Sequence, residues 1–217
     1  MDAVSTLPFP ASVYAARLDR AASLAADSGL DGIVVGPGPD LQYLVGVEGD
    51  TIERLTALVL GPGLAPTIVV PRMELAKVRT TAVGALGLAV SDWVDGDNPY
   101  DLVAAALGTV SRVGVSDALP ALHVIPLADR IDVRVELATP VLREGRMIKD
   151  AEEIAELRLA GEAIDAVHRR VPEWLRAGRT EREVAADIAE AIVAEGHRTV
   201  EFLSLIHISE PTRQAEI

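Results

Sequence analysis

Residues 145–166 read GRMIKDAEEIAELRLAGEAIDA, and at this stretch the sequence changes character. Asp150 is followed three residues later by Glu153, which is a capping box: the aspartate accepts from first-turn amides and the glutamate reaches back. Residues at steps of three and four then form one stripe of a helix: Ile154, Leu157, Gly161, Ile164, His168, Val171 and Leu175. The stretch predicts a long amphipathic helix, which Pro172 should kink or break near Val171.

A second helix of the same kind follows. Thr180 and Glu183 repeat the capping box, and an apolar stripe comes after them: Val184, Ile188, Ala191 and Ile192. No strand follows that these two helices could cover. We therefore expect residues 143–202 to be the start of a truncated domain whose sheet lies further downstream.

The last residues, 203–217, read LSLIHISEPTRQAEI and abandon the Ala/Val/Arg-rich composition of the preceding chain. This segment resembles the translation of a sequencing adapter. Such sequence is excluded from reasoning about the fold. We expect residues 203–217 to be a non-native tail, and we set His207 and Glu210 aside as functional candidates.

Upstream of the long helix, residues 12–138 alternate helices with short strands. The first helix is expected over residues 12–29, with Ser12 as its cap and Gly29 as its stop. Short apolar runs separated by Gly and Pro turns read as strands, and Val133, Val135 and Leu137 alternate with polar residues. This pattern predicts an α/β fold, a three-layer domain with a largely parallel or mixed sheet, over residues 1–142.

Composition narrows the class of protein. The chain has 217 residues and a formal net charge of −13, which opposes binding to a nucleic acid or to an anionic membrane. It contains no cysteine, so a thiolate nucleophile and a Cys-bound zinc are excluded. No signal peptide and no apolar run of membrane-spanning length is visible. We expect a soluble, cytoplasmic protein.

The segment VVGPGPD, residues 34–40, invites comparison with a phosphate-binding loop. Gly36 and Gly38 are in place, but Leu41 stands where the dinucleotide fingerprint needs its third glycine. Pro37 and Pro39 also remove two N–H donors that would hold a phosphate. A rigid turn is the better interpretation.

The remaining candidates form no catalytic constellation. His123 stands alone, His168 lies on the helical stripe and reads as a packed histidine, and His197 follows a helix end and reads as solvated. Three carboxylates are explained by the first turns of their helix, whose dipole favours them: Glu152, Glu153 and Glu156. The pair Asp95 and Asp97 lacks the other ligands of a calcium loop. No catalytic, cofactor-binding or metal-ligating residue is assigned in this chain.

Two stretches nevertheless resemble a known family. DGIVVGPGPDLQYLVG, residues 31–46, is similar to the early strand and turn of the N-terminal domain of creatinase, prolidase and aminopeptidase P. There an aromatic residue precedes a hydrophobic pair and a glycine, matched by Tyr43, Leu44 and Gly46. The junction of that domain with the catalytic domain carries an Arg-x-Ile-Lys-x-x-x-Glu-Ile pattern, matched by Arg146, Ile148, Lys149, Glu153 and Ile154.

The resemblance, to the pita-bread metallopeptidases, implies an X–Pro dipeptidase or an aminopeptidase P-like hydrolase. It implies that the helices of residues 143–202 open an α+β pita-bread domain. In that family two divalent metal ions (such as Mn, Co or Zn) are held by two Asp, one His and two Glu, and a metal-bound hydroxide attacks the peptide carbonyl. These ligands lie further downstream; Glu201 and Phe202 are expected just before the first strand of the substrate pocket.

Three further implications follow from the resemblance. The intact parent is expected to act on proline-containing peptides and to form a homodimer, whereas the present chain is expected to be inactive and to bind no stoichiometric metal. A creatinase-like C–N hydrolase on the same fold is an open alternative, because fold does not fix substrate. A pseudoenzyme that binds peptides or proteins without catalysis is the other.

Overall fold

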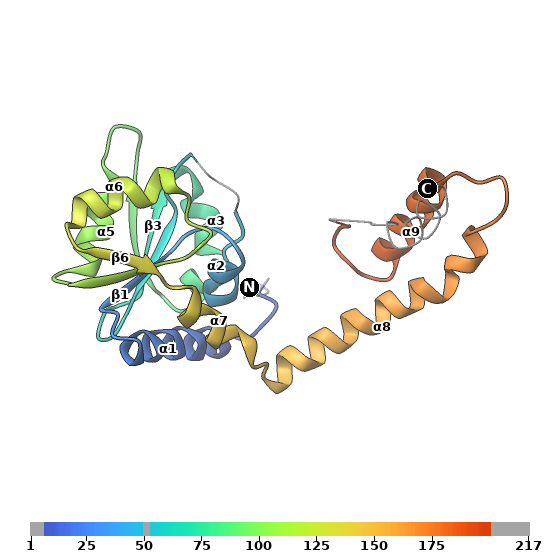
Figure 1. Ribbon diagram of the computed structural model, residues 1–217, viewed down its shortest axis with the longest axis horizontal. Helices are drawn as coiled ribbons and strands as arrows, with labels where there is room; N and C mark the ends of the chain where they lie inside the picture. Colours follow the sequence, from blue (N-terminus) through green and yellow to red (C-terminus); the bar gives the residue numbers. More distant parts are fainter. Residues whose placement is uncertain (1–6, 50–52, 201–217) are drawn as a thin grey trace, which may run out of the picture. The chain divides into compact units, whose positions relative to one another are not determined.

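The computed structural model describes residues 7–49 and 53–200, in two compact units, Met1–Ile148 and Lys149–Ile217 (Figure 1). The elements of the first unit are, in chain order, α1 (Ala11–Asp27), β1 (Gly32–Val35), α2 (Pro39–Val45), β2 (Ala57–Leu60), β3 (Thr67–Pro71), the 3-10 helix η1 (Arg72–Glu74), α3 (Leu75–Arg79), α4 (Ala82–Ala85), β4 (Ala89–Trp93), α5 (Pro99–Leu107), β5 (Arg112–Val115), α6 (Ala121–Ile131), β6 (Arg134–Leu137) and α7 (Thr139–Met147). The second unit contains α8 (Ala151–Trp174) and α9 (Glu181–Ala194).

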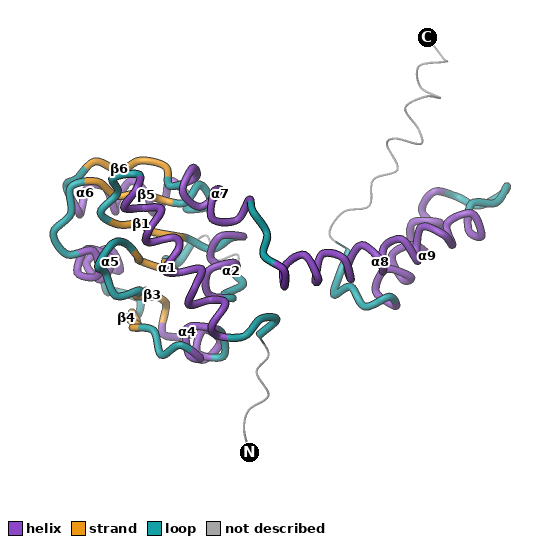
Figure 2. Tube along the Cα trace, turned by 90° about the horizontal axis from the view of Figure 1, so that it is seen from below, coloured by secondary structure: helices purple, strands orange, loops and turns teal. Residues whose placement is uncertain are grey.

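The strands of the first unit form one six-stranded sheet in the order β4-β3-β2-β1-β5-β6. The pairs β1–β2 and β2–β3 are antiparallel, and the pairs β3–β4, β1–β5 and β5–β6 are parallel. In Figure 2 the labelled strands β6, β5, β1, β3 and β4 follow one another in this order. The sheet is therefore mixed, as the sequence predicts.

Alternate residues of the central strands enter two separate cores. Ile33 and Val35 of β1 pack with α1, α2, α3, α4 and α7, whereas Val34 packs with α5 and α6 on the other face. Strands β2 and β3 divide their residues in the same way, because successive side chains of a strand point to opposite faces. Figure 1 shows α5 and α6 on one side of the sheet and α1, α2, α3 and α7 on the other. The expected three-layer α/β arrangement is confirmed.

Local start and stop signals are partly confirmed. Asn98 caps α5 by accepting from the Tyr100 amide at 3.1 Å, with Pro99 at the first helical position. The expected cap at Ser12 is wrong: α1 begins at Ala11 behind Pro10, and no side chain caps it. Pro10 precedes the helix with φ −57° and ψ 149°, and its ring offers no acceptor to the first-turn N–H groups.

The segment of residues 121–131 forms a regular helix in spite of an internal proline. Helix α6 is continuous through Pro126. Pro126 interrupts one backbone hydrogen bond only, and Leu127, fully buried against the sheet, holds the helix in place. At the neighbouring edge strand, Leu137 is 62% exposed, so the alternation of β6 does not bury both of its apolar residues.

The second unit is a helical pair. Both expected capping boxes are present, at Asp150 with Glu153 and at Thr180 with Glu183. The residues buried between α8 and α9 are Val167, Val184, Ile188 and Ala191, with Val171, Trp174 and Ile192 packed around them. The expected break near Val171 is wrong: α8 contains Pro172 and ends at Trp174. The proline lies so close to the helix end that little helix remains for it to disrupt.

Candidate functional site

The crevice at the carboxyl ends of β1 and β5 is where an open parallel sheet would bind a nucleotide. Here it is filled by protein. The Gly36 amide donates to Ser116 Oγ at 2.9 Å, and a Cβ on Gly36 would lie 2.8 Å from Leu119 Cδ1. A Cβ on Gly38 would lie 2.9 Å from the Cβ of Ala118. The two loops are packed against each other, which agrees with a rigid turn rather than a phosphate loop.

The histidines do not come together. His123 is buried and not alone, because its Nδ1 lies 3.0 Å from the Tyr100 hydroxyl across α5 and α6. Burial raises the pKa of Tyr100. His168 is exposed rather than packed: Val167 faces α9, and the next residue points elsewhere. His197 is half-buried, not solvated, and its Nε2 has no hydrogen-bond partner among the described residues.

The carboxylates have structural partners. Glu153 closes the capping box of α8, accepting from the Asp150 amide at 3.0 Å. Asp95 pairs with Arg54, and Asp97 accepts from the Val94 amide at 3.0 Å. Within residues 7–49 and 53–200 no group of three or more His, Cys, Asp or Glu side chains is placed to hold a metal ion. These residues do not fit a two-metal centre.

Hollows remain on the described part of the first unit. One is an open groove at the carboxyl ends of β3 and β4, lined by Arg54, Pro71, Arg72, Met73, Trp93, Val94 and Asp95. Its volume is about 160 Å³, below the roughly 300 Å³ at which small-molecule sites usually begin. Both arginines are already paired, Arg54 with Asp95 at 2.9 Å and Arg72 with Asp92 at 2.6 Å. The hydrogen bond from Arg72 lowers the pKa of Asp92.

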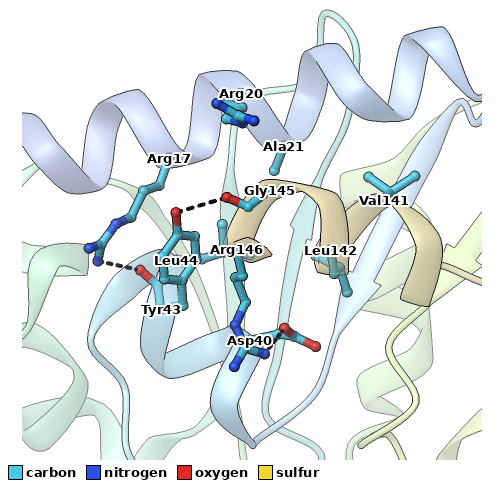
Figure 3. Close-up of a pocket in the computed structure, with 10 residues that line it drawn as sticks. All are labelled: Arg17, Arg20, Ala21, Asp40, Tyr43, Leu44, Val141, Leu142, Gly145 and Arg146. Atoms are coloured by element: carbon cyan, nitrogen blue, oxygen red, sulfur yellow. Dashed lines mark hydrogen bonds and ion pairs between the residues drawn. The ribbon is translucent and has the colours of Figure 1, made fainter. Parts of the chain in front are cut away.

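Another hollow lies between α1, α2 and α7 (Figure 3). It is lined by Arg17, Arg20, Ala21, Asp40, Tyr43, Leu44, Val141, Leu142, Gly145 and Arg146. Arg146 forms a salt bridge of 2.5 Å with Asp40, whose side chain is 11% exposed. The Tyr43 hydroxyl donates to the Gly145 carbonyl at 3.1 Å. The volume is about 10 Å³, room for one water molecule and no more.

A buried arginine organises one wall of this pocket. Arg17 donates to the Tyr43 carbonyl at 3.0 Å, and its guanidinium carbon lies 4.1 Å from the centre of the Tyr43 ring. The Phe9 and Tyr14 rings approach the same guanidinium at 4.6 and 5.3 Å. Such contacts are cation–π interactions, which strengthen when the cation is removed from water. Burial raises the pKa of Tyr14, although the charge of Arg17 acts in the opposite direction.

Five residues of this pocket belong to the stretches that carry the family resemblance or flank them: Asp40, Tyr43, Leu44, Gly145 and Arg146. Two segments therefore meet in one place, through contacts that join residues 102 and 106 positions apart in the sequence. The Creatinase/Prolidase N-terminal domain matches residues 17–148, more than half of the chain. The chain belongs to the creatinase/prolidase N-terminal domain family.

Metallopeptidase family M24 matches residues 155–214 of this creatinase/prolidase family member. The fold class expected from the sequence is thus confirmed, with a three-layer α/β unit ahead of the helices of a metallopeptidase domain. The match includes residues 203–214, part of the segment expected to be non-native. That expectation, with His207 and Glu210, lies outside the described residues, as do Glu201 and Phe202.

Relatives and solved structures share this organisation. "Probable dipeptidase PepE" of Mycobacterium tuberculosis is 58% identical over 196 residues, 90% of this chain and 52% of that protein. The crystal structure of dipeptidase PepE from Mycobacterium ulcerans is 56% identical with a TM-score of 0.84, over 89% of this chain and 53% of that one. The prolidase of Thermococcus sibiricus is 29% identical with a TM-score of 0.75, over 87% and 52%. The chain spans about half the length of the relatives it matches.

Sequence reasoning did not identify Arg17, Asp40 or Ser116 as organising residues. One signal was available for Arg17. It stands on the apolar face of α1 between Tyr14 and Leu18, where an unpaired charge is costly and a partner is therefore required. Asp40 gave no such signal, because an aspartate in the first turn of a helix is explained by the helix dipole.

Proposed function

We propose that this chain is the N-terminal part of a metal-dependent peptidase that cleaves X–Pro bonds, a dipeptidase or an aminopeptidase P-like hydrolase. One observation carries the proposal: a creatinase/prolidase N-terminal domain over residues 17–148 is followed directly by a metallopeptidase M24 match over residues 155–214. The similarity to the mycobacterial dipeptidases supports the peptidase class, and the similarity to a prolidase supports proline-containing substrates.

In this proposal residues 1–142 are the N-terminal domain, residues 143–202 are the start of the catalytic domain, and residues 203–217 are a non-native tail. The two divalent metal ions, such as Mn, Co or Zn, belong to the part of the parent that this chain does not contain. The 217-residue chain itself has no hydrolase activity. The parent is a cytoplasmic homodimer that takes proline-containing peptides. No helix within the described residues is both long enough and apolar enough to span a membrane.

Expression of the complete coding sequence tests this proposal. The purified parent is assayed on X–Pro dipeptides and on creatine, and its metal content is measured. Hydrolysis of X–Pro dipeptides that stops with a chelator and returns with added metal is the expected result. Turnover of creatine alone points to a creatinase-like C–N hydrolase, and a folded protein without metal or activity points to a pseudoenzyme. Either of these two results overturns the proposal.

A further inference from the structure

The last turn of α7 lacks apolar anchors. Val141 and Leu142 are buried, at 3% and 4% exposure, and they fix the first half of the helix against α1 and the sheet. The residues that follow are half-buried or exposed, and Met147 and Ile148 are 60% and 66% exposed. The first unit ends at Ile148. Apolar packing therefore stops well before the point at which the polypeptide leaves this unit.

Two polar contacts from α2 reach the same turn (Figure 3). The Gly145 carbonyl is one of the last four of α7, which have no partner within the helix, and it accepts from the Tyr43 hydroxyl at 3.1 Å. Arg146 stands where the helix dipole favours a cation, and it binds Asp40 at 2.5 Å. The helix end is thus capped by side chains from another element rather than by its own sequence.

Further contacts hold Tyr43 and Asp40 in position. Arg17 stacks on the Tyr43 ring and donates to the Tyr43 carbonyl, which holds the hydroxyl in position. Asp40 is nearly buried in the first turn of α2, which directly follows the central strand β1 and its tight turn. The donor and acceptor that reach α7 are therefore carried by the helix that directly follows β1, a strand buried along its whole length.

The pocket between these side chains is too small to bind a ligand. A pocket of about 10 Å³ accommodates a water molecule but no substrate or cofactor. Its polar groups are directed at one another, Asp40 at Arg146 and Tyr43 at Gly145. The pocket is therefore a set of contacts between elements rather than a ligand site.

We propose that Asp40 and Tyr43 are positioning residues that hold the last turn of α7 and so fix the point at which the polypeptide leaves the first unit. Asp40, Tyr43, Gly145 and Arg146 are called the α7 latch below. In the proposed peptidase this point is where the catalytic domain is attached. That consequence rests on the proposed function, whereas the latch itself is a property of the first unit alone.

Hydrogen exchange followed by mass spectrometry on the 217-residue chain tests the α7 latch. Tyr43→Phe removes one hydroxyl and keeps the ring on Arg17, and Asp40→Asn removes the charge at constant shape. We expect peptides covering residues 143–150 to exchange at least about tenfold faster in each variant, as the loss of a charged or capping hydrogen bond allows. Peptides from β1 and β5 should exchange at the same rate as in the unsubstituted 217-residue chain.

Matched variants separate positioning from general stability. Asp101→Asn removes the carboxylate that pairs with Arg130 between α5 and α6, away from α7, and should leave residues 143–150 unchanged. Asp40→Glu keeps the charge and should restore part of the protection. The proposal is overturned if residues 143–150 exchange at the rate of the unsubstituted chain in both latch variants, or if exchange rises equally throughout the first unit. Because no activity is measured, this outcome is independent of the proposed peptidase.

Discussion

Gly36→Ala is predicted to destabilise the first unit, because the turn after β1 is packed without space for a methyl group. A Cβ at this position would lie 2.8 Å from Leu119 Cδ1 and 3.2 Å from both Cα and Cβ of Leu119. Cα is a backbone atom and the position of Cβ is fixed by the backbone, so a rotamer change cannot relieve these two contacts. Overpacking of this kind costs about 1–3 kcal/mol. A shift of the turn also weakens the bond from the Gly36 amide to Ser116 Oγ, worth about 1 kcal/mol.

Urea unfolding with fluorescence detection measures this loss. Trp93 is 7% exposed in the first unit, and the chain's other tryptophan, Trp174, is removed as Trp174→Phe so that only the first unit reports. A loss of about 2 kcal/mol lowers the urea midpoint by about 1 M. Gly49→Ala is the control, because a Cβ there meets no heavy atom of the described residues within 4 Å. Equal midpoints for Gly36→Ala and Gly49→Ala would refute the packed-crevice interpretation.

Three further predictions concern pH and the helical pair. The amides of Ser111 and Arg112 donate to Asp31 and lower the pKa of its carboxyl group, so ionised Asp31 stabilises the fold above the unfolded pKa of 3.8 and this contribution is lost as the pH falls through the lower folded pKa. Asp31→Asn should therefore flatten the decline in urea midpoint on acidification below pH 3.8. An unchanged decline would contradict this. Gly161→Ala should stabilise α8 by up to about 1 kcal/mol and raise its helicity, since alanine favours a helix and no described atom lies within 4 Å of the added methyl group. Circular dichroism measures the helicity, and a loss of helicity would be inconsistent with this geometry. Thr180→Ala should destabilise α9 by about 1 kcal/mol, because it removes the capping box. The expected readout is faster amide exchange in the first turn of α9, and unchanged exchange there would count against the cap.

The layered fold was predictable from the sequence because its signals are local. Short apolar runs between Gly and Pro turns predicted the strands, and the two capping boxes predicted helix starts. The errors arose where a local signal competed with tertiary packing. His168 was placed on a buried stripe, but the contact with α9 selects Val167 instead. Pro172 was expected to break the helix, but it lies close to Trp174, where α8 ends.

The α7 latch was not predictable, because its contacts join residues 102 and 106 positions apart in the chain. Nothing in the local pattern around Asp40 or Arg146 states which charge each one meets. The family resemblance drew attention to Tyr43 and Arg146 separately, and the structure shows that the segments carrying them meet at one helix end. The sequence assigns no catalytic residue to this chain, which agrees with our proposal that the reaction centre belongs to the remainder of the parent.

The most direct test of the central claim is an assay of the purified 217-residue chain on an X–Pro dipeptide, with added Mn²⁺, Co²⁺ or Zn²⁺ and with a chelator. Release of free proline is measured against a blank without protein. If the catalytic centre lies outside this chain, release equals the blank under every condition and the chelator changes nothing. Release of proline that scales with protein concentration and stops with the chelator would place the reaction centre within these residues and contradict the account.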